Sequence, residues 1–486
     1  MNQAPDRAAR ADMSLDPDDW TALRSQGHRM LDDMLDYLEH LRERPVWQPI
    51  PQSVRDHFSE PLPLEPEALP AIHRQFMEEI LPYSVGNAHP GFMGWVHGGG
   101  TAVGMLAEML AAGLNANLGG RDQIPIAVER QVVRWMGDLF GFPEEASGLF
   151  VTGTSMANFI ALLVARTAAL GAASRQNGVA ASDLRLTAYA SCGAHGCIAQ
   201  AMDLAGLGSG ALRRIPVNAR FEMDLQRLQE SILSDREAGF TPFFVVGTAG
   251  TVDVGALDDF RGLAALCRRE RLWFHVDGAF GALAKLSPEL APRLEGMESA
   301  DSIAFDFHKW GQVPYDAGFI LVRDDAQHRQ AFESPAAYLR RESRGAAGGS
   351  PWPCDYGPDL SRGFRALKAW FTLKAFGADR LGQVIAHTCA LARYLESRIQ
   401  QCPELELLAP VALNIVCFRY RAARPDEANA RIVVALHESG IAVPSTTRLG
   451  DALAIRVAIV NHRTEHADID RLLDAVLSFG SREVAP

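Results

Sequence analysis

Cysteine is scarce in this chain of 486 residues: there are seven, an odd number, and no Cys-x-x-Cys motif occurs. This usage argues against a disulfide framework and against a zinc ribbon. Cys192 and Cys197 flank His195, but no other ligand cluster accompanies them, so we predict no metal site. No run reaches about 18 uninterrupted apolar residues, and the first 20 residues lack an apolar core. We therefore expect neither a membrane span nor a signal peptide, and we predict a cytoplasmic protein.

Positive charge is also in short supply, since 47 Lys and Arg residues face 59 Asp and Glu residues and give a net charge of -12. A nucleic-acid surface needs a basic face, so we expect no nucleic-acid partner. No Gly-x-Gly-x-x-Gly follows a predicted strand, because GLGSG at 206–210 has the wrong spacing, and a dinucleotide-binding fold is disfavoured. The composition is otherwise that of a globular protein, and the length predicts about three domains.

The N-terminal region is predicted to contain one long amphipathic helix over residues 17–42. Asp16 or Asp18 can cap its start, and a Pro-rich segment from Pro45 onward ends it. Such a helix cannot bury its apolar stripe alone, so it needs the body of the protein or a second subunit. The stripe consists of Leu23, Met30, Leu31, Met34, Leu35, Leu38 and Leu41.

Short apolar runs alternate with helical patterns between residues 95 and 330. Strands buried on both faces of a sheet read in this way, and the alternation predicts an α/β fold with a mainly parallel sheet. The runs are GLFVTG (148–153), LTAYAS (186–191), FFVVGT (243–248), LWFHVD (272–277), SIAFD (302–306) and GFILV (318–322). Later helical patterns and the strand-like runs at 413–420 and 452–461 predict a small α+β domain. We expect an N-terminal helical arm (1–90), a large domain (91–376) and this small C-terminal domain (377–486).

Polar residues follow these strands, at the edge where open parallel sheets bind ligands. Thr154 and Ser155 open a helix after the first run, where free N–H groups can hold a phosphate, or they simply cap the helix. His195 can stack on a flat cofactor or be an ordinary loop histidine. Thr248 or Thr251, after FFVVGT, can bind a ligand or belong to a turn.

Charged residues end the next two strands. Asp277 terminates an apolar run, and a buried carboxylate needs a partner such as a pyridinium, a metal ion or a helix end. Gly278 and Ala279 are small, as a flat ring against the backbone requires. Lys309 follows a buried strand, where a lysine amine can act as a nucleophile toward carbonyls, and His308 can reach a phosphate.

Taken together, these residues supply every group that pyridoxal phosphate requires. Lys309 would form the Schiff base, Asp277 would keep the pyridine nitrogen protonated, and the hydroxyl residues would hold the phosphate. His195 would cover one face of the ring. The predicted cofactor site comprises Thr154, Ser155, His195, Thr248, Asp277, Ala279, His308 and Lys309.

With these motifs the sequence resembles the fold-type I pyridoxal-phosphate enzymes, and specifically the group II amino-acid decarboxylases, which include the aromatic-L-amino-acid decarboxylases. The resemblance runs from about Trp20 to Phe479. It implies a central, mainly parallel seven-stranded sheet, a small α+β domain, and an N-terminal arm that packs on the partner of a homodimer. The motifs are AHPGF (88–92), TGTSMAN (152–158), SCGAH (191–195), GTAGTVDVGALDD (247–259), HVDGAFGA (275–282), DSIAFDFHKW (301–310), FRALKAWF (364–371) and RVAIVNHRT (456–464).

The resemblance also implies a role for each reacting residue. Lys309 matches the Schiff-base lysine, Asp277 the pyridinium partner, His195 the stacking histidine and His308 the histidine near the phosphate. The family carries a mobile loop with a tyrosine that protonates the substrate carbon, and SPAAYLRRE (334–342) makes Tyr338 that residue. The implied reaction is decarboxylation of an L-amino acid to its amine and carbon dioxide, with an aromatic substrate favoured.

The sequence departs from the family at HVDGAFGA, TGTS and FHKW, but every reacting group is retained. The substrate pocket is less defined. In GFMGWVHGGG, Trp95 and His97 are candidate substrate-binding residues, and GLNANLGG brings Asn115 and Asn117 to the next pocket segment. A polar or acidic substrate therefore stays open beside an aromatic one.

Other functions are compatible with parts of this pattern. An aminotransferase would use Arg456 to clamp the substrate α-carboxylate, although Tyr338 and the HKW motif argue against it. An oxidative enzyme would yield aldehyde, ammonia and peroxide, and in the family it carries Phe in place of the loop tyrosine. A non-enzymatic pyridoxal-phosphate-binding scaffold would not need Lys309, Asp277 and Tyr338 together.

Overall fold

A seven-stranded sheet forms the centre of the computed structural model, which describes residues 14–334 and 340–484. Its strand order is β2-β8-β7-β6-β5-β3-β4. All strands run parallel except β8, which is antiparallel to both of its neighbours. The predicted mainly parallel α/β fold is therefore confirmed. The strands are β2 (Ser147–Val151), β3 (Leu186–Ser191), β4 (Leu212–Ile215), β5 (Thr241–Thr248), β6 (Trp273–Asp277), β7 (Ser302–Asp306) and β8 (Gly318–Val322).

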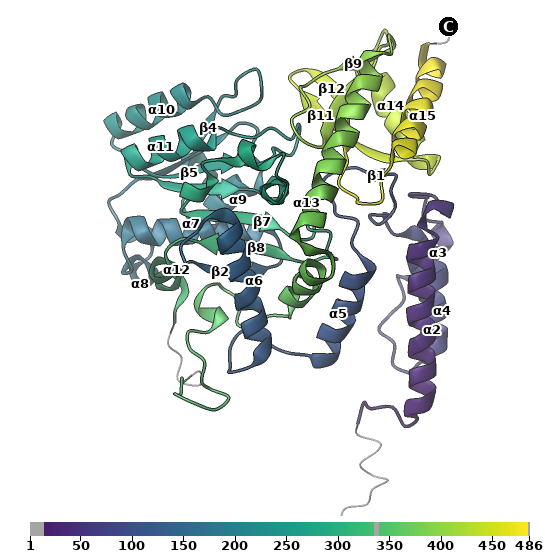
Figure 1. Cartoon of the computed structure of the whole chain (residues 1–486), viewed down its shortest axis with the longest axis horizontal. Helices are drawn as coiled ribbons and strands as arrows, with labels where there is room; N and C mark the ends of the chain where they lie inside the picture. The colour runs from purple at the N-terminus through teal and green to yellow at the C-terminus, as the bar shows by residue number, and fades with distance from the viewer. Residues whose placement is uncertain (1–13, 335–339, 485–486) are drawn as a thin grey trace, which may run out of the picture.

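Helices cover both faces of this sheet, which explains why its strands are continuously apolar (Figure 1). On β5, Phe244 and Val246 pack into the cluster beneath α7 (Thr154–Leu170) and α9 (Cys197–Leu204). Val245, between them, packs into the opposite cluster. That cluster is covered by α6 (Ile124–Phe140), α10 (Leu225–Glu237), α11 (Phe260–Glu270) and the start of α13 (Arg365–Gln400).

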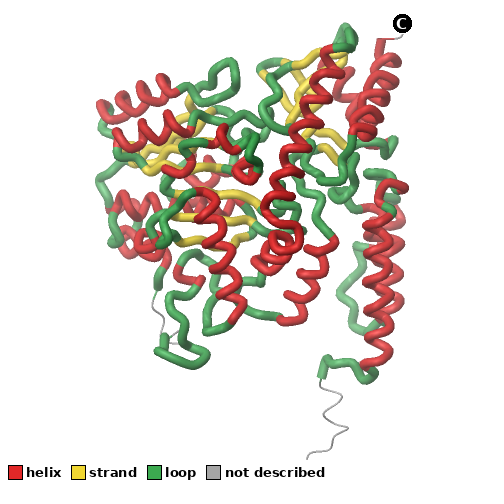
Figure 2. Tube along the Cα trace, in the orientation of Figure 1, coloured by secondary structure: helices red, strands yellow, loops and turns green. Residues whose placement is uncertain are grey.

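A second, smaller sheet lies beside the large one, as the two groups of yellow strands in Figure 2 show. It consists of β1 (Phe92–Met93), β11 (Val443–Leu449), β12 (Ala452–Ala458), β10 (Ile415–Tyr420) and β9 (Leu405–Leu407), in that spatial order. Two helices, α14 (Pro425–Glu438) and α15 (His466–Val484), pack against it. The long helix α13 connects the two sheets, and Gly377, with a φ of 77°, divides it into two helical segments.

The N-terminal helix α2 (Trp20–Glu39) stands apart from the large sheet, with α4 (Leu69–Gln75) alongside it (Figure 1). Its cap is Asp19, not Asp16 or Asp18, because Asp19 Oδ1 accepts the N–H groups of Thr21 (2.8 Å) and Ala22 (3.1 Å). Within α2 only Gln26 is buried. Of the predicted stripe inside α2, Met30 is exposed, and the other leucines and methionines are only partly buried within a single chain.

The remaining α-helices of the described residues are α3 (Gln52–His57), α5 (Ala102–Leu114), α8 (Ser174–Asn177) and α12 (Asp325–Phe332). Among the described residues, no helix combines the length and the apolar character that a bilayer crossing demands.

A buried ion pair joins β2 to the segments that flank the site. The Arg362 guanidinium pairs with Glu129 of α6 and donates to the carbonyl oxygens of Leu118 (3.0 Å) and Phe150 (2.8 Å). The Glu129 carboxylate also accepts the Phe150 N–H at 3.0 Å. Both side chains are almost completely buried, so neither charge has a ready alternative partner in water.

Arg362→Met should destabilise the protein by about 3–5 kcal/mol, because it leaves the Glu129 charge buried and unpaired. Urea unfolding of the cofactor-free protein, followed by circular dichroism, measures this loss. Adding Glu129→Gln removes the stranded charge while keeping an acceptor for Phe150, so the double variant should recover part of the loss. A double variant less stable than Arg362→Met would contradict this account.

Candidate active site

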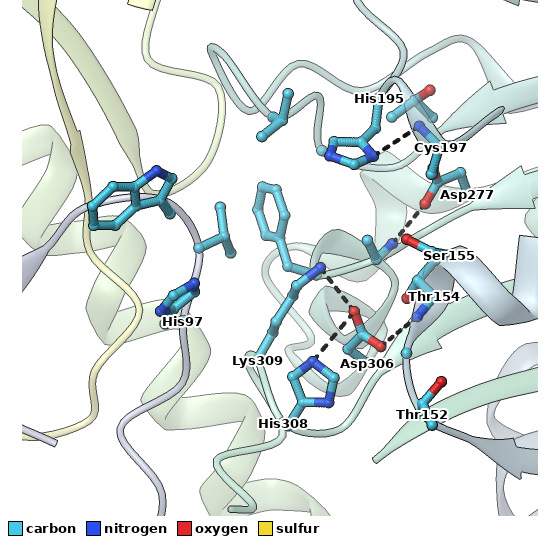
Figure 3. Close-up of a pocket in the computed structure, with 18 of the residues that line it drawn as sticks. His97, Thr152, Thr154, Ser155, His195, Cys197, Asp277, Asp306, His308 and Lys309 are labelled. Carbon is cyan, nitrogen blue, oxygen red and sulfur yellow. Dashed lines mark hydrogen bonds and ion pairs between the residues drawn. The ribbon is translucent and has the colours of Figure 1, made fainter. Parts of the chain in front are cut away.

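A cavity of about 410 Å³ opens at the carboxyl ends of the parallel strands. Its walls come from the residues that follow β2, β3, β5, β6 and β7, together with the segment 95–97 (Figure 3). Ten of the described residues predicted to bind cofactor or substrate lie in these walls: Trp95, His97, Thr154, Ser155, His195, Thr248, Asp277, Ala279, His308 and Lys309. Tyr338, the predicted proton donor, lies outside the described residues.

Asp306, the last residue of β7, organises one side of the cavity (Figure 3). Its Oδ2 lies 2.8 Å from Lys309 Nζ, and its Oδ1 accepts the N–H of Thr154, the first residue of α7, at 2.8 Å. The same carboxylate lies 3.6 Å from His308 Nε2. One buried side chain thus fixes the lysine relative to the helix N-terminus.

His308 is buried between Asp306 and Tyr315. Its Nδ1 accepts the Ala317 N–H at 3.0 Å, which leaves the proton of the neutral ring on Nε2, facing Asp306. The Tyr315 ring lies over it with a centroid separation of 4.2 Å. Burial, partly opposed by the nearby Asp306 charge, lowers the pKa of His308 to about 4, so the ring is neutral near pH 7.

Asp277 ends β6 in a fully buried position on the opposite side of the cavity (Figure 3). Its Oδ1 accepts the Ala279 N–H and its Oδ2 accepts an Nδ2–H of Asn158, each at 3.1 Å. Burial raises the pKa of this carboxyl group, while the positive charge of Lys309 opposes the rise. Within residues 14–334 and 340–484, no cationic side chain forms an ion pair with Asp277. A cation delivered into the cavity would supply that partner.

Two buried threonine hydroxyl groups form another feature of the site. Thr154 Oγ1 and Thr248 Oγ1 are buried without a hydrogen-bond partner in the described part of the chain, and Thr154 stands at the positive end of the α7 dipole. Thr251 takes the turn role, because its Oγ1 accepts the Ala256 N–H at 3.0 Å. An anion near α7, a cation near Asp277 and a carbonyl near Lys309 would satisfy the whole set, and these are the groups of pyridoxal phosphate.

His195 reaches the cavity from the loop after β3 (Figure 3). Its Nδ1 accepts the Cys197 N–H at 3.2 Å. Burial raises the pKa of the Cys197 thiol to about 12, so the thiol stays protonated, whereas Cys192 is exposed. Among the described residues, no group of three or more His, Cys, Asp or Glu side chains is arranged to hold a metal ion.

The mouth of the cavity is aromatic. The His97 ring stacks on Phe92 (5.5 Å) and on Trp95 (6.0 Å), and Tyr315 meets its edge at 5.7 Å. This segment can approach the lysine because residue 98 is glycine: a Cβ there would lie 2.4 Å from the Lys309 carbonyl oxygen.

Three residues predicted near the substrate lie elsewhere. Asn115 ends α5 in the left-handed conformation, with a φ of 47°, and Asn117 Oδ1 accepts the N–H groups of Gly119 and Arg362. Neither asparagine belongs to the described cavity walls. Arg456 donates to the carbonyl oxygens of Trp95, Val252 and Asp253, so its guanidinium braces the backbone behind the cavity.

Sequence reasoning missed Asn158, Asp306 and Tyr315. Asp306 carried a usable signal, because it ends a buried strand as Asp277 does. Asn158 lies in the TGTSMAN motif inside a helix, and nothing in the sequence says which face of that helix meets the sheet.

Comparisons with known proteins agree with this geometry. The model of the pyridoxal-dependent decarboxylase conserved domain matches residues 51–421. An aromatic-L-amino-acid decarboxylase of Bacillus atrophaeus is 33% identical over 460 residues, covering 91% of this chain and 92% of the relative. A histidine decarboxylase of Mus musculus is 31% identical, covering 92% of this chain and 69% of the relative. A solved structure of Oryza sativa TDC with PLP and tryptamine shares the fold, with a TM-score of 0.88 and 24% identity over 97% of this chain and 100% of that one.

The buried His308 should make folding stability depend on pH. Its pKa falls from 6.5 in the unfolded chain to about 4 in the fold, so the unfolded state binds more protons between these values. The contribution of the neutral ring to the free energy of unfolding is present above about pH 6.5 and is lost as the pH falls toward 4. At pH 5 the loss is about 2 kcal/mol. Urea unfolding of the cofactor-free protein at pH 7.5 and pH 5 should therefore show a smaller loss for His308→Gln than for the parent.

His28→Gln, at an exposed position of α2, is the matched control and should change with pH as the parent does. Equal losses in the parent and in His308→Gln would show that His308 is not the responsible group.

Proposed function

From the premise that this chain belongs to the pyridoxal-dependent decarboxylase family, and is an enzyme that decarboxylates an amino acid with pyridoxal phosphate, we propose an aromatic L-amino acid as its substrate. The observation that carries the proposal is the aromatic lining of the cavity. Trp95, His97, Phe280 and Tyr315 all contribute to its walls. Aromatic rings attract one another in stacked and edge-to-face arrangements, so such a lining favours an aromatic substrate side chain.

We assign a role to each residue of the site from its position in the cavity. When bound, pyridoxal phosphate supplies an electron-withdrawing ring that stabilises negative charge on the substrate α-carbon. Thr154, Ser155 and His308 would hold the phosphate, because the α7 dipole and the hydroxyl groups meet there. Asp277 would hold the proton on the pyridine nitrogen, and Thr248 and Ala279 would line the ring edge.

Lys309 is the proposed nucleophile toward the cofactor carbonyl, and His195 the residue that covers the ring face. The Asp306 carboxylate, 2.8 Å from Lys309 Nζ, holds the amine at the cavity wall and is positioned to accept its proton. Protonation of the α-carbon is assigned to Tyr338, which lies outside the described residues.

A polar or acidic substrate remains the competing choice of side chain. One relative is a histidine decarboxylase, and an imidazole would also fit the aromatic lining of the cavity. An acidic side chain finds less support, because no arginine lies in the described walls of the cavity.

We also propose that the large domain ends and the small C-terminal domain begins near residue 377. We further propose that the chain forms a homodimer through its N-terminal arm. Trp20 and Met30 of α2 are 59% and 37% exposed, and Phe58, Leu62 and Leu64 of the following segment are more than half exposed. Apolar side chains in this number are costly in water, and a second copy of the arm or of the body would cover them.

An amine-release screen over the twenty protein amino acids, with carbon dioxide, aldehyde and peroxide measured in parallel, tests the substrate and the reaction. We expect amine and carbon dioxide in equal amounts, with the highest kcat/KM for an aromatic amino acid. Lys309→Ala is the control and should lose both amine release and borohydride-trappable cofactor. An acidic preferred substrate would overturn the substrate proposal, and aldehyde with peroxide as main products would overturn the reaction.

Deleting residues 1–45 should yield monomer or aggregate in light scattering after size exclusion, because the arm would no longer cover its partner. Deletion of residues 1–13 leaves α2 whole and serves as the control, which should keep the dimer. Leu31→Asp with Leu35→Asp is a milder variant, for use if the long deletion does not fold. A stable dimer in that variant and in the 1–45 deletion would refute the proposed role of the arm.

A further inference from the structure

A row of hydrogen-bonded side chains lies behind Asp277, inside the protein and away from the cavity. Asn158 of α7 contacts Asp277, His275 of β6 contacts Asn158, and Ser302 of β7 contacts His275. The indole of Trp273 ends the row at Ser302. Asn158, His275 and Ser302 are each at most 1% exposed, so water does not complete their hydrogen bonds. None of the three lines the cavity.

The chemistry of the groups gives this row a direction. The indole N–H can only donate, so Trp273 Nε1 donates to Ser302 Oγ at 2.9 Å. Asn158 Oδ1 can only accept, so His275 Nε2 donates to it (2.8 Å), and Nδ1 of the neutral ring accepts from the Ser302 hydroxyl (2.8 Å). With its oxygen occupied in this way, the Asn158 amide turns its N–H groups toward Asp277 Oδ2 (3.1 Å) and Cys197 Sγ (3.3 Å).

The charge state of the row is fixed as well. Burial lowers the pKa of His275 to about 3, so the ring carries one proton near pH 7. The neutral ring leaves Nδ1 free to accept a hydrogen bond from the Ser302 hydroxyl. Each member therefore donates to the next one in the row, and Asn158 donates to Asp277. A carboxylate that accepts hydrogen bonds is stabilised in its ionised form.

We propose that Asn158 and His275 are positioning residues that keep the Asp277 carboxylate ionised and aimed at the pyridine nitrogen of the bound cofactor. Neither touches the cofactor: Asn158 acts through Asp277, and His275 acts through Asn158. The proposal rests on the proposed role of Asp277 and extends it to a set of side chains buried outside the cavity.

A cofactor analogue separates this role from simple packing. The 1-deaza analogue of pyridoxal phosphate has a C–H group in place of the ring nitrogen, so it cannot use an ionised Asp277. We would titrate the cofactor-free full-length protein with pyridoxal phosphate and with the analogue, and measure both dissociation constants by absorbance. The variants are Asn158→Leu, His275→Phe, the conservative His275→Gln, and Asp277→Ala as the reference.

Asn158→Leu should weaken pyridoxal phosphate binding by roughly tenfold to a hundredfold, the range expected for a lost hydrogen bond to a charged group. Its effect on the deaza analogue should stay within about threefold, since the analogue does not draw on that bond. His275→Phe should behave in the same way, and His275→Gln should recover part of the loss because its amide can donate to Asn158 Oδ1.

Two outcomes would overturn different statements. If Asn158→Leu and His275→Phe weaken both ligands equally, the two residues serve packing alone and the positioning role fails. If Asp277→Ala also fails to distinguish the ligands, the assignment of Asp277 to the pyridine nitrogen fails with it. Should Asn158→Leu not fold, the comparison of His275→Phe with His275→Gln decides the question.

Discussion

The buried carboxylate of Asp277 is the constraint on which the site depends. A carboxylate placed at the end of a strand that is covered on both faces loses its hydration, and the loss costs several kcal/mol unless a cation and hydrogen bonds replace the water. The fold provides the hydrogen bonds, from Ala279 and Asn158, but no side chain of the described residues forms an ion pair with this carboxylate. A protonated ring nitrogen would complete the set, so cofactor binding and the stability of this part of the sheet are linked.

Asp306 repeats the arrangement one strand away, with a different consequence. Its carboxylate joins the N-terminus of α7, the amine of Lys309 and the His308 ring. Asp306 therefore holds both the N-terminus of α7, proposed to bind the phosphate, and Lys309, proposed to attack the carbonyl. A change in the charge of Lys309 changes the electrostatic potential at the start of α7. Because β6 and β7 are adjacent and parallel, the two carboxylates stand at the same edge of the sheet.

Much of this arrangement could be predicted from the sequence, because it rests on local patterns. Six of the seven strands are apolar runs, and the polar residues after them mark the edge of the sheet. The edge strand β4 (LRRI) was missed because its two central arginines interrupt the apolar run. Asn158 and His275 were also missed as site residues, although both lie in conspicuous motifs. The contact between them joins α7 to β6 across 117 positions of the chain, and neither motif predicts that pairing.

The contacts of the Arg456 side chain differ from those that its position in the sequence suggested. Its position suggested a clamp for the substrate carboxylate, yet its guanidinium donates to the backbone oxygens of Val252, Asp253 and Trp95. A substrate carboxylate in the described cavity therefore meets no arginine. The same guanidinium holds the Trp95 carbonyl and so fixes the backbone of the proposed aromatic mouth.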